Sequence, residues 1–189
     1  MLMADSGRFA PWRSHSPVMR RVLVVNGHPD PRPERFCAAL CNAYADGARS
    51  AGHRVRSMRV GELPLSTDSV EFAIAREQIG WSDRLLVAFP IWLGGPPPAV
   101  VRVFDAFAKE DRAVFGEHVD PPGMERRSHL VMTASLPSLL YRSSGIPHVG
   151  SMPGMRSSPP TIIGSVNSIS EEDRRRWLRE MENLGAKVK

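Results

Sequence analysis

The sequence predicts a doubly wound α/β domain, in which helices cover both faces of a parallel sheet. Uninterrupted aliphatic runs at 22–25 and 85–89 lack the polar alternation of a half-exposed strand, so each is expected to be covered on both faces. Stretches with helical periodicity separate the predicted strands, and this alternation is typical of a parallel sheet. Ligands of such sheets bind at the carboxyl ends of the strands, near the point where the strand order reverses.

Length and composition favour one compact domain without disulfides. The chain has 189 residues, of which 42% are hydrophobic and 24% charged, and we place the domain at 19–189. Residues 1–18 show no sustained period and predict a disordered N-terminal arm, with Met19 as a candidate for the true start. No apolar stretch of spanning length and no leader pattern occur, which predicts a cytoplasmic protein without a membrane span.

The net charge of +5 comes from arginines that are spread along the chain. Aromatic residues are not interleaved with them as in a nucleic-acid platform, so no nucleic acid is expected as a partner, whereas an anionic cofactor would be attracted. Cys37 and Cys41 lie four residues apart and are expected to pack in a helix. No Cys/His cluster has zinc spacing, and no metal site is predicted.

The first strand is followed by a predicted helix over 33–51, which Pro33 or Glu34 can open and Gly52 can end. A strand that leads through a loop into a helix aims unpaired backbone N–H groups and the positive end of the helix dipole at one point. A phosphate fits such a point.

Three residues of this first loop and helix start suit a ligand. Gly27 lets the backbone approach it, and His28 and Arg35 add hydrogen-bond donors. An isolated histidine more often has a structural or surface role. That alternative applies to His28, His53, His118, His129 and His148.

The remaining elements follow in alternation. Residues 54–60 mix apolar residues with arginines, as expected of a strand near a sheet edge. Asp68 with Glu71 resembles a cap that opens a helix reaching Trp81. The other predicted elements are a strand at 85–89, a helix at 98–108, strands at 128–133 and 161–166, and a closing helix that Ser170 and Asp173 open.

Two further loops carry candidate residues. In the loop over 89–98, Trp92 precedes glycines and prolines, which offers backbone donors beside a flat apolar wall, as a planar heteroaromatic ring requires; Trp92 facing the core is the alternative. After the strand at 128–133, Thr133 and Ser135 either contact a ligand or cap the turn. Tyr141 either donates to a ligand carbonyl or packs on its ring.

Other nucleotide and hydrolase chemistries lack their motifs. The chain has no Gly-x-Gly-x-x-Gly after a strand, no Gly-x-x-x-x-Gly-Lys-Ser/Thr loop and no Gly-x-Ser-x-Gly elbow.

Three segments together resemble the flavodoxin-like NAD(P)H:quinone oxidoreductase family, over about residues 21–186. They are 24–30 with Arg35 and Phe36, 89–94 with 98–99, and 132–137 with Tyr141. The resemblance implies a flavodoxin-like five-stranded parallel sheet in three α/β/α layers. It also implies a non-covalent flavin, FMN or otherwise FAD, that accepts hydride from NADPH or NADH and reduces a quinone or similar small acceptor, in a protein that is commonly a homodimer.

The resemblance also implies roles for individual residues. Around the flavin phosphate it places His28, Arg35, Phe36 and Cys37. At the edge of the flavin ring it places Pro90, Ile91, Trp92, Leu93 and Gly94. On the pyrimidine side it places Thr133, Ala134 and Ser135. Trp92, as a wall beside the ring, and Tyr141, as a donor to a flavin carbonyl or substrate oxygen, are the implied catalytic residues.

Three departures from the family pattern bear on function. The family often has Ser or Thr where Arg35 stands, so a guanidinium is expected to replace a hydroxyl at the phosphate. The loop at 95–98 is one residue longer. The stretch at 142–160 is short and rich in proline, which favours an alternative function as a flavodoxin-like regulatory or binding subunit with little or no catalysis.

Overall fold

The computed structural model describes residues 18–92, 95–114, 125–143 and 155–188. Within them a parallel sheet has the strand order β2-β1-β3-β4-β5, and β6 also pairs with β4. The strands are β1 (Arg21–Asn26), β2 (Arg54–Arg59), β3 (Arg84–Ile91), β4 (Arg127–Ala134), β5 (Arg156–Ser157) and β6 (Thr161–Ile163). The helices are α1 (Phe36–Ser50), the 3₁₀ turn η1 (Val60–Glu62), α2 (Val70–Trp81), α3 (Pro98–Val114), α4 (Ser138–Ser143) and α5 (Glu171–Ala186).

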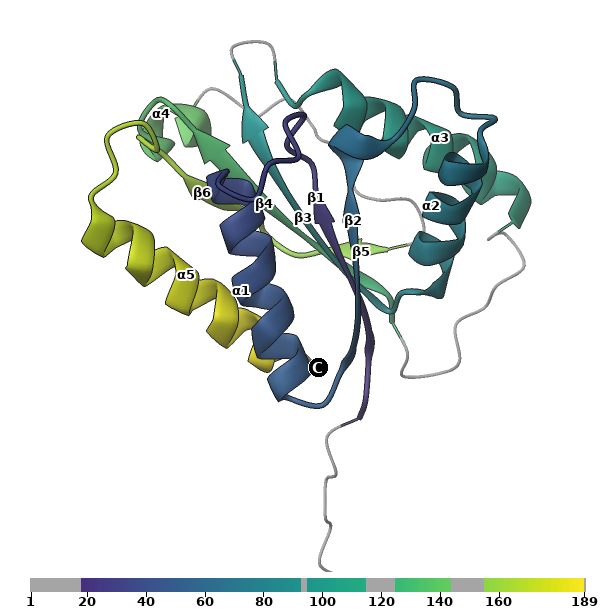
Figure 1. Ribbon diagram of the computed structural model, residues 1–189, viewed down its shortest axis with the longest axis horizontal. Coiled ribbons are helices and arrows are strands. Elements are labelled where there is room, and N and C mark those ends of the chain that lie inside the picture. The colour runs from purple at the N-terminus through teal and green to yellow at the C-terminus, as the bar shows by residue number, and fades with distance from the viewer. Residues whose placement is uncertain (1–17, 93–94, 115–124, 144–154, 189) are drawn as a thin grey trace, which may run out of the picture.

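The arrangement confirms the predicted three-layer fold. Helices α1 and α5 cover one face of the sheet, and α2 and α3 cover the other (Figure 1). The chain passes from β1 outward to β2 and returns to β3 on the other side of β1, so the strand order reverses between β1 and β3. β2 lies at the edge of the sheet, as its arginine-rich sequence predicted.

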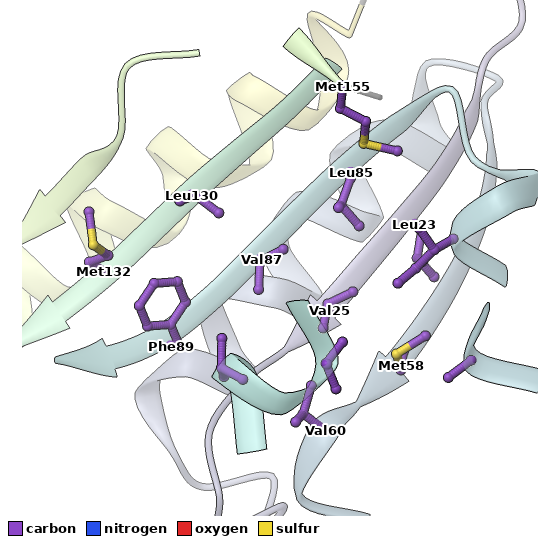
Figure 2. Packing of buried hydrophobic residues seen from close by; sticks show 14 of the residues in the cluster. Leu23, Val25, Met58, Val60, Leu85, Val87, Phe89, Leu130, Met132 and Met155 are labelled. Atoms are coloured by element: carbon purple, nitrogen blue, oxygen red, sulfur yellow. The ribbon is translucent and has the colours of Figure 1, made fainter. Parts of the chain in front are cut away.

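Both faces of the central strands are buried, which explains why their sequences lack alternation. Val22 and Val24 pack with α1 and α5, whereas Leu23 and Val25 pack with α2 and α3. Figure 2 shows the second of these clusters, in which Leu23, Val25, Leu85, Val87, Phe89, Leu130 and Met132 project from one face of the sheet. A strand that buries both sets of side chains cannot carry a polar residue at every second position.

The predicted C-terminus of α1 is confirmed, and its N-terminus lies later in the sequence than predicted. Gly52 has a φ of 84°, and the N–H groups of Gly52 and His53 donate to the carbonyls of Arg49 and Ala48, at 2.9 and 3.0 Å. This pair of bonds is the Schellman motif that glycine favours, so the predicted stop is confirmed. The helix begins at Phe36, with Arg35 and not Pro33 or Glu34 as the residue that precedes its first turn.

The predicted cap of α2 is wrong by one residue. Ser69, and not Asp68, accepts the N–H of Phe72, at 3.2 Å. The predicted cap of α5 is confirmed, because Ser170 Oγ accepts the N–H of Asp173 at 3.0 Å. Helix α3 continues beyond the predicted end at 108, and α4 was not predicted.

The predicted strand at 161–166 is only partly formed. β6 ends at Ile163, and the chain then turns through Ser165, whose φ is 55°. A further short strand, β5, pairs with the start of β4, so the sheet has six strands within the described residues, where five were predicted. Pro159 and Pro160 lie between β5 and β6 and have no N–H groups to donate, which interrupts the pairing along β4.

Two glycines let α1 and α5 approach closely. A Cβ atom on Gly47 would lie 1.9 Å from the carbonyl oxygen of Glu182, and one on Gly185 would lie 2.1 Å from that of Tyr44. These distances are far inside van der Waals contact. The backbones therefore touch only because both positions lack a side chain.

We expect Gly47→Ala to lower the free energy of unfolding by about 1–3 kcal/mol, because a methyl group forces the helices apart. Urea denaturation followed by circular dichroism measures this. Gly80→Ala is the matched control: Gly80 is exposed within α2, so alanine there should be neutral or stabilise by up to about 1 kcal/mol. Equal stabilisation by both substitutions would contradict the close packing of α1 against α5.

Candidate functional site

A cavity of about 300 Å³ lies where the loops after β1, β3 and β4 meet. The register brings these loops together, since Asn26 pairs with Ala88 and Pro90 pairs with Thr133. This is the carboxyl edge of the parallel strands next to the reversal in strand order, where α/β sheets bind ligands. The cavity is lined by His28, Glu34, Arg35, Phe36, Cys37, Pro90, Ile91, Trp92, Thr133, Ser135, Val166, Asn167 and Arg174.

The N-terminus of α1 supplies one end of the cavity. Among the described side chains none caps it, and its first turn contains no acidic residue. Helices α2 and α5, by contrast, are capped by Ser69 and Ser170. The first-turn N–H groups beside Phe36 and Cys37 and the positive end of the helix dipole therefore suit an anion.

Arg35 lines the cavity, but its guanidinium is held by a carboxylate. Nε of Arg35 donates to Oδ2 of Asp30 at 2.7 Å, and its Nη2 donates to the same oxygen. Arg32 also binds Asp30, with Nη2 2.6 Å from Oδ2. The two guanidinium groups, first Arg32 and then Arg35, hold the pKa of Asp30 well below its usual range. The trio carries a net positive charge beside the cavity.

Arg174 is a cavity residue that the sequence did not reveal. It reaches from α5, and its guanidinium lies 4.6 Å from the centre of the Phe36 ring. Its neighbours Arg175 and Arg176 instead pair with Glu171 and Asp173 on their own helix. Nothing in a run of three arginines marks the first of them, so only the packing of α5 beside α1 shows that Arg174 faces the cavity.

His28 is positioned by the backbone of its own loop. Nδ1 lies 3.0 Å from both the backbone nitrogen and the carbonyl oxygen of Asp30, which leaves Nε2 to meet a ligand. Burial is the largest influence on its pKa and, with the nearby Arg35, lowers it. Gly27 lets the loop pack closely against β3, because a Cβ atom at this position would lie 2.9 Å from Cβ of Phe89.

Trp92 stands at the mouth of the cavity. Its backbone exchanges two hydrogen bonds of 3.0 Å with Gly95, and these bonds form an antiparallel bridge just after β3. The side chain is 51% exposed and lines the cavity, so the alternative that Trp92 packs in the core is wrong. Leu93 and Gly94 lie outside the described residues.

The loop after β4 forms the opposite wall. Thr133 is buried, with Oγ1 3.4 Å from Sγ of Cys37, and Ser135 Oγ accepts from Nδ2 of Asn167 at 3.2 Å. Ala134 lies beneath the lining, and its carbonyl accepts the N–H of Val166 at 3.0 Å. Neither Val166 nor Asn167 was among the predicted residues.

Tyr141 does not line the cavity. It lies on α4 and packs against the core cluster on the α2 and α3 side of the sheet. His148 and most of the proline-rich segment after Tyr141 fall outside the described residues.

The two cysteines are packing residues, as predicted. Burial raises the pKa of the Cys37 thiol to about 11, and burial also raises that of Cys41, whose Sγ donates to the carbonyl of Val25 at 3.6 Å. Thiols in this state are poor nucleophiles. Within the described residues, no group of three or more His, Cys, Asp or Glu side chains could hold a metal ion, and no helix is long and apolar enough to cross a membrane.

The sequence and fold define the family. Residues 20–184 match the model of the family described as the flavodoxin-like fold, and the chain belongs to this family. No curated protein matches the sequence.

Solved structures share the fold at low sequence identity. The NAD(P)H:quinone oxidoreductase from Methanothermobacter marburgensis is 18% identical with a TM-score of 0.69, over 89% of this chain and 95% of that one. The azoreductase from Bacillus anthracis str. Sterne is 16% identical with a TM-score of 0.63, over 90% and 100%. An NADH:FMN oxidoreductase is 14% identical with a TM-score of 0.61, over 89% of each chain.

The burial of both thiols predicts that they react slowly in the native protein. At pH 8 the native protein should react with Ellman's reagent much more slowly than the urea-unfolded protein, because neither thiol is exposed or ionised. Asn42→Cys is a matched control, since position 42 is exposed on the same helix and should give one rapidly reacting thiol. Native protein that reacts as fast as this control would contradict the described packing.

Proposed function

We propose that the protein is a flavin-dependent oxidoreductase that takes hydride from NADPH or NADH and passes two electrons to a quinone or a similar small acceptor. The observation that carries the proposal is the composition of the cavity at the strand reversal. An uncapped helix N-terminus, two arginines and the exposed ring of Trp92 line it together. A flavin mononucleotide needs this combination, because it joins a phosphate to a flat apolar ring.

The described residues fit FMN in chemistry. The first-turn N–H groups of α1, Arg174, Arg35 and Nε2 of His28 would hold the phosphate, with Phe36 and Cys37 beside it. The cavity of about 300 Å³ is at the lower end of small-molecule sites, which favours FMN over the larger FAD.

The other two loops would hold the ring. Its edge would lie along Pro90, Ile91 and Trp92, continued by Leu93 and Gly94. Its pyrimidine side would meet the loop formed by Thr133, Ala134 and Ser135.

The flavin supplies the hydride chemistry, and the residues of the chain position the reactants. Trp92 would form a wall against which a nicotinamide or quinone ring stacks. Tyr141 packs against the core cluster and does not line the cavity, so no role at the flavin is proposed for it. The leucines of the segment beside the cavity, Leu136, Leu139 and Leu140, are 45, 74 and 51% exposed. This apolar surface supports the expectation of a homodimer that covers it.

The test is the visible spectrum of the purified protein mixed with FMN, desalted, and then exposed to NADPH or NADH without oxygen. A retained flavin band that bleaches is expected. A retained band that neither donor bleaches would contradict the oxidoreductase and favour the regulatory subunit. Loss of the band on desalting, together with no saturable change in FMN fluorescence on titration, would contradict the flavin site.

Arg174→Ala should raise the dissociation constant of FMN by at least about tenfold. The reason is that a hydrogen bond to a charged group contributes about 1.5–3 kcal/mol. Quenching of FMN fluorescence measures the affinity. Arg175→Ala is the control, because it removes the same charge from the adjacent residue, which does not line the cavity. Equal dissociation constants for the two variants would remove Arg174 from the site.

A further inference from the structure

The amino ends of the strands, opposite the carboxyl ends at the proposed flavin cavity, carry a row of arginines. Each strand from β1 to β5 begins with one: Arg21, Arg54, Arg84, Arg127 and Arg156. The register pairs Arg54 with Arg21, and it pairs Arg127 with both Arg84 and Arg156. Arg84 pairs with Val22 and not with Arg21, so the arginines form two neighbouring sets. Because the strands are parallel, these arginines lie at the amino ends of the strands, opposite the carboxyl ends from which the loops after β1, β3 and β4 emerge (Figure 1).

Few carboxylates lie among these cations in the described residues. Asp83 binds Arg21, with 2.6 Å between Oδ1 and Nη2. Glu125 is shared by Arg127 and Arg156, at 2.8 and 3.0 Å. Two acidic groups thus serve three guanidinium groups, and the edge keeps a positive field.

A cavity of about 250 Å³ opens within this row. Arg84, Arg127 and Lys187 bring three cations to it, and His129 and two serines add polar groups. None of the described residues that line it carries a carboxylate. Leu184, Val188 and the ring of Tyr44 form its apolar side.

We propose that this cavity binds a small organic phosphate, with the phosphate dianion against Arg84, Arg127 and Lys187 and the organic group against the apolar side. Guanidinium groups bind phosphate through paired hydrogen bonds, and a lysine adds a point charge. The volume lies just below the range of drug-sized sites, so it suits a phosphomonoester better than a dinucleotide.

The cations repel one another when no anion is present. Burial, followed by the charges of Arg20 and Arg127, lowers the pKa of Arg84. Nη1 of Arg84 is fixed by the carbonyls of Asp83 and Glu125, at 2.9 and 2.6 Å, so this guanidinium stays at the cavity. An anion bound here would relieve the repulsion.

Two features oppose an anion, and both are weaker than the three cations. The carbonyl end of α5 is close, but a helix dipole is equivalent to about half a charge, and the N–H groups of Lys187 and Val188 already bind carbonyls of the last turn. Glu125 competes for Arg127. An exposed ion pair of this kind contributes little to stability, so Arg127 can exchange it for a ligand.

The test is amide NMR of the FMN-treated protein titrated with phenyl phosphate and, separately, with inorganic phosphate. Saturable shifts are expected at Ser128, His129 and Lys187, with tighter binding of phenyl phosphate, because only that probe reaches the apolar side. Equal affinity for both probes would assign the site to free phosphate and overturn the organic-phosphate proposal. Shifts confined to the start of α1, or no saturation, would overturn the site itself.

Variants distinguish phosphate binding in this cavity from attraction to the overall positive charge of the protein. Arg127→Gln and Lys187→Ala should each weaken phenyl phosphate at least fivefold, whereas Glu125→Gln should strengthen it because a competing carboxylate is lost. Arg59→Gln is the matched control: Arg59 also pairs with one glutamate and is similarly exposed, at 54% against 52% for Arg127, but it lies at the other end of a strand. Equal weakening by Arg59→Gln, or no strengthening by Glu125→Gln, would overturn the proposal.

Discussion

The parallel pairing of β1 with strands on both sides is the constraint on which the site depends. β1 is hydrogen-bonded to β2 on one side and to β3 on the other, so the loop after β1 emerges beside the loop after β3. The N–H of Gly27 donates to the carbonyl of Ala88 at 2.7 Å, which continues the ladder beyond the strand. The start of α1 is thereby fixed next to the end of β3, so that Phe36, Cys37 and Trp92 line the same cavity.

The positive charge at the cavity comes from several arginines and not from Arg35 alone. Asp30 draws Arg32 and Arg35 together, so the two guanidinium groups form a fixed positive cluster and not a mobile fork. Arg174, which stacks on Phe36, is the cation that approaches from another helix. The same excess of arginine recurs at the opposite edge, where each strand from β1 to β5 begins with one. The sheet is thus basic at both the carboxyl ends and the amino ends of its strands, although different helices and loops surround the arginines at each end.

The sequence predicted those features that local pattern determines. Runs such as 22–25 and 85–89 identified central strands because both faces of these strands are buried, and Gly52 marked a helix end because its turn needs a positive φ. Features set by pairing between distant segments escaped prediction. The segment that pairs with β4 is divided into β5 and β6 because two prolines lie between them. The position of Arg174 at the cavity depends on how α5 packs beside α1. No local signal separates Arg174 from Arg175.

The most direct test of the central claim is a crystal structure of the protein with FMN. We predict that the phosphate lies within hydrogen-bond distance of the first-turn N–H groups of α1 and of Arg174, with the flavin ring beside Trp92. A phosphate bound instead in the basic cavity at the amino-terminal edge, or a flavin ring that occupies the start of α1, would contradict it.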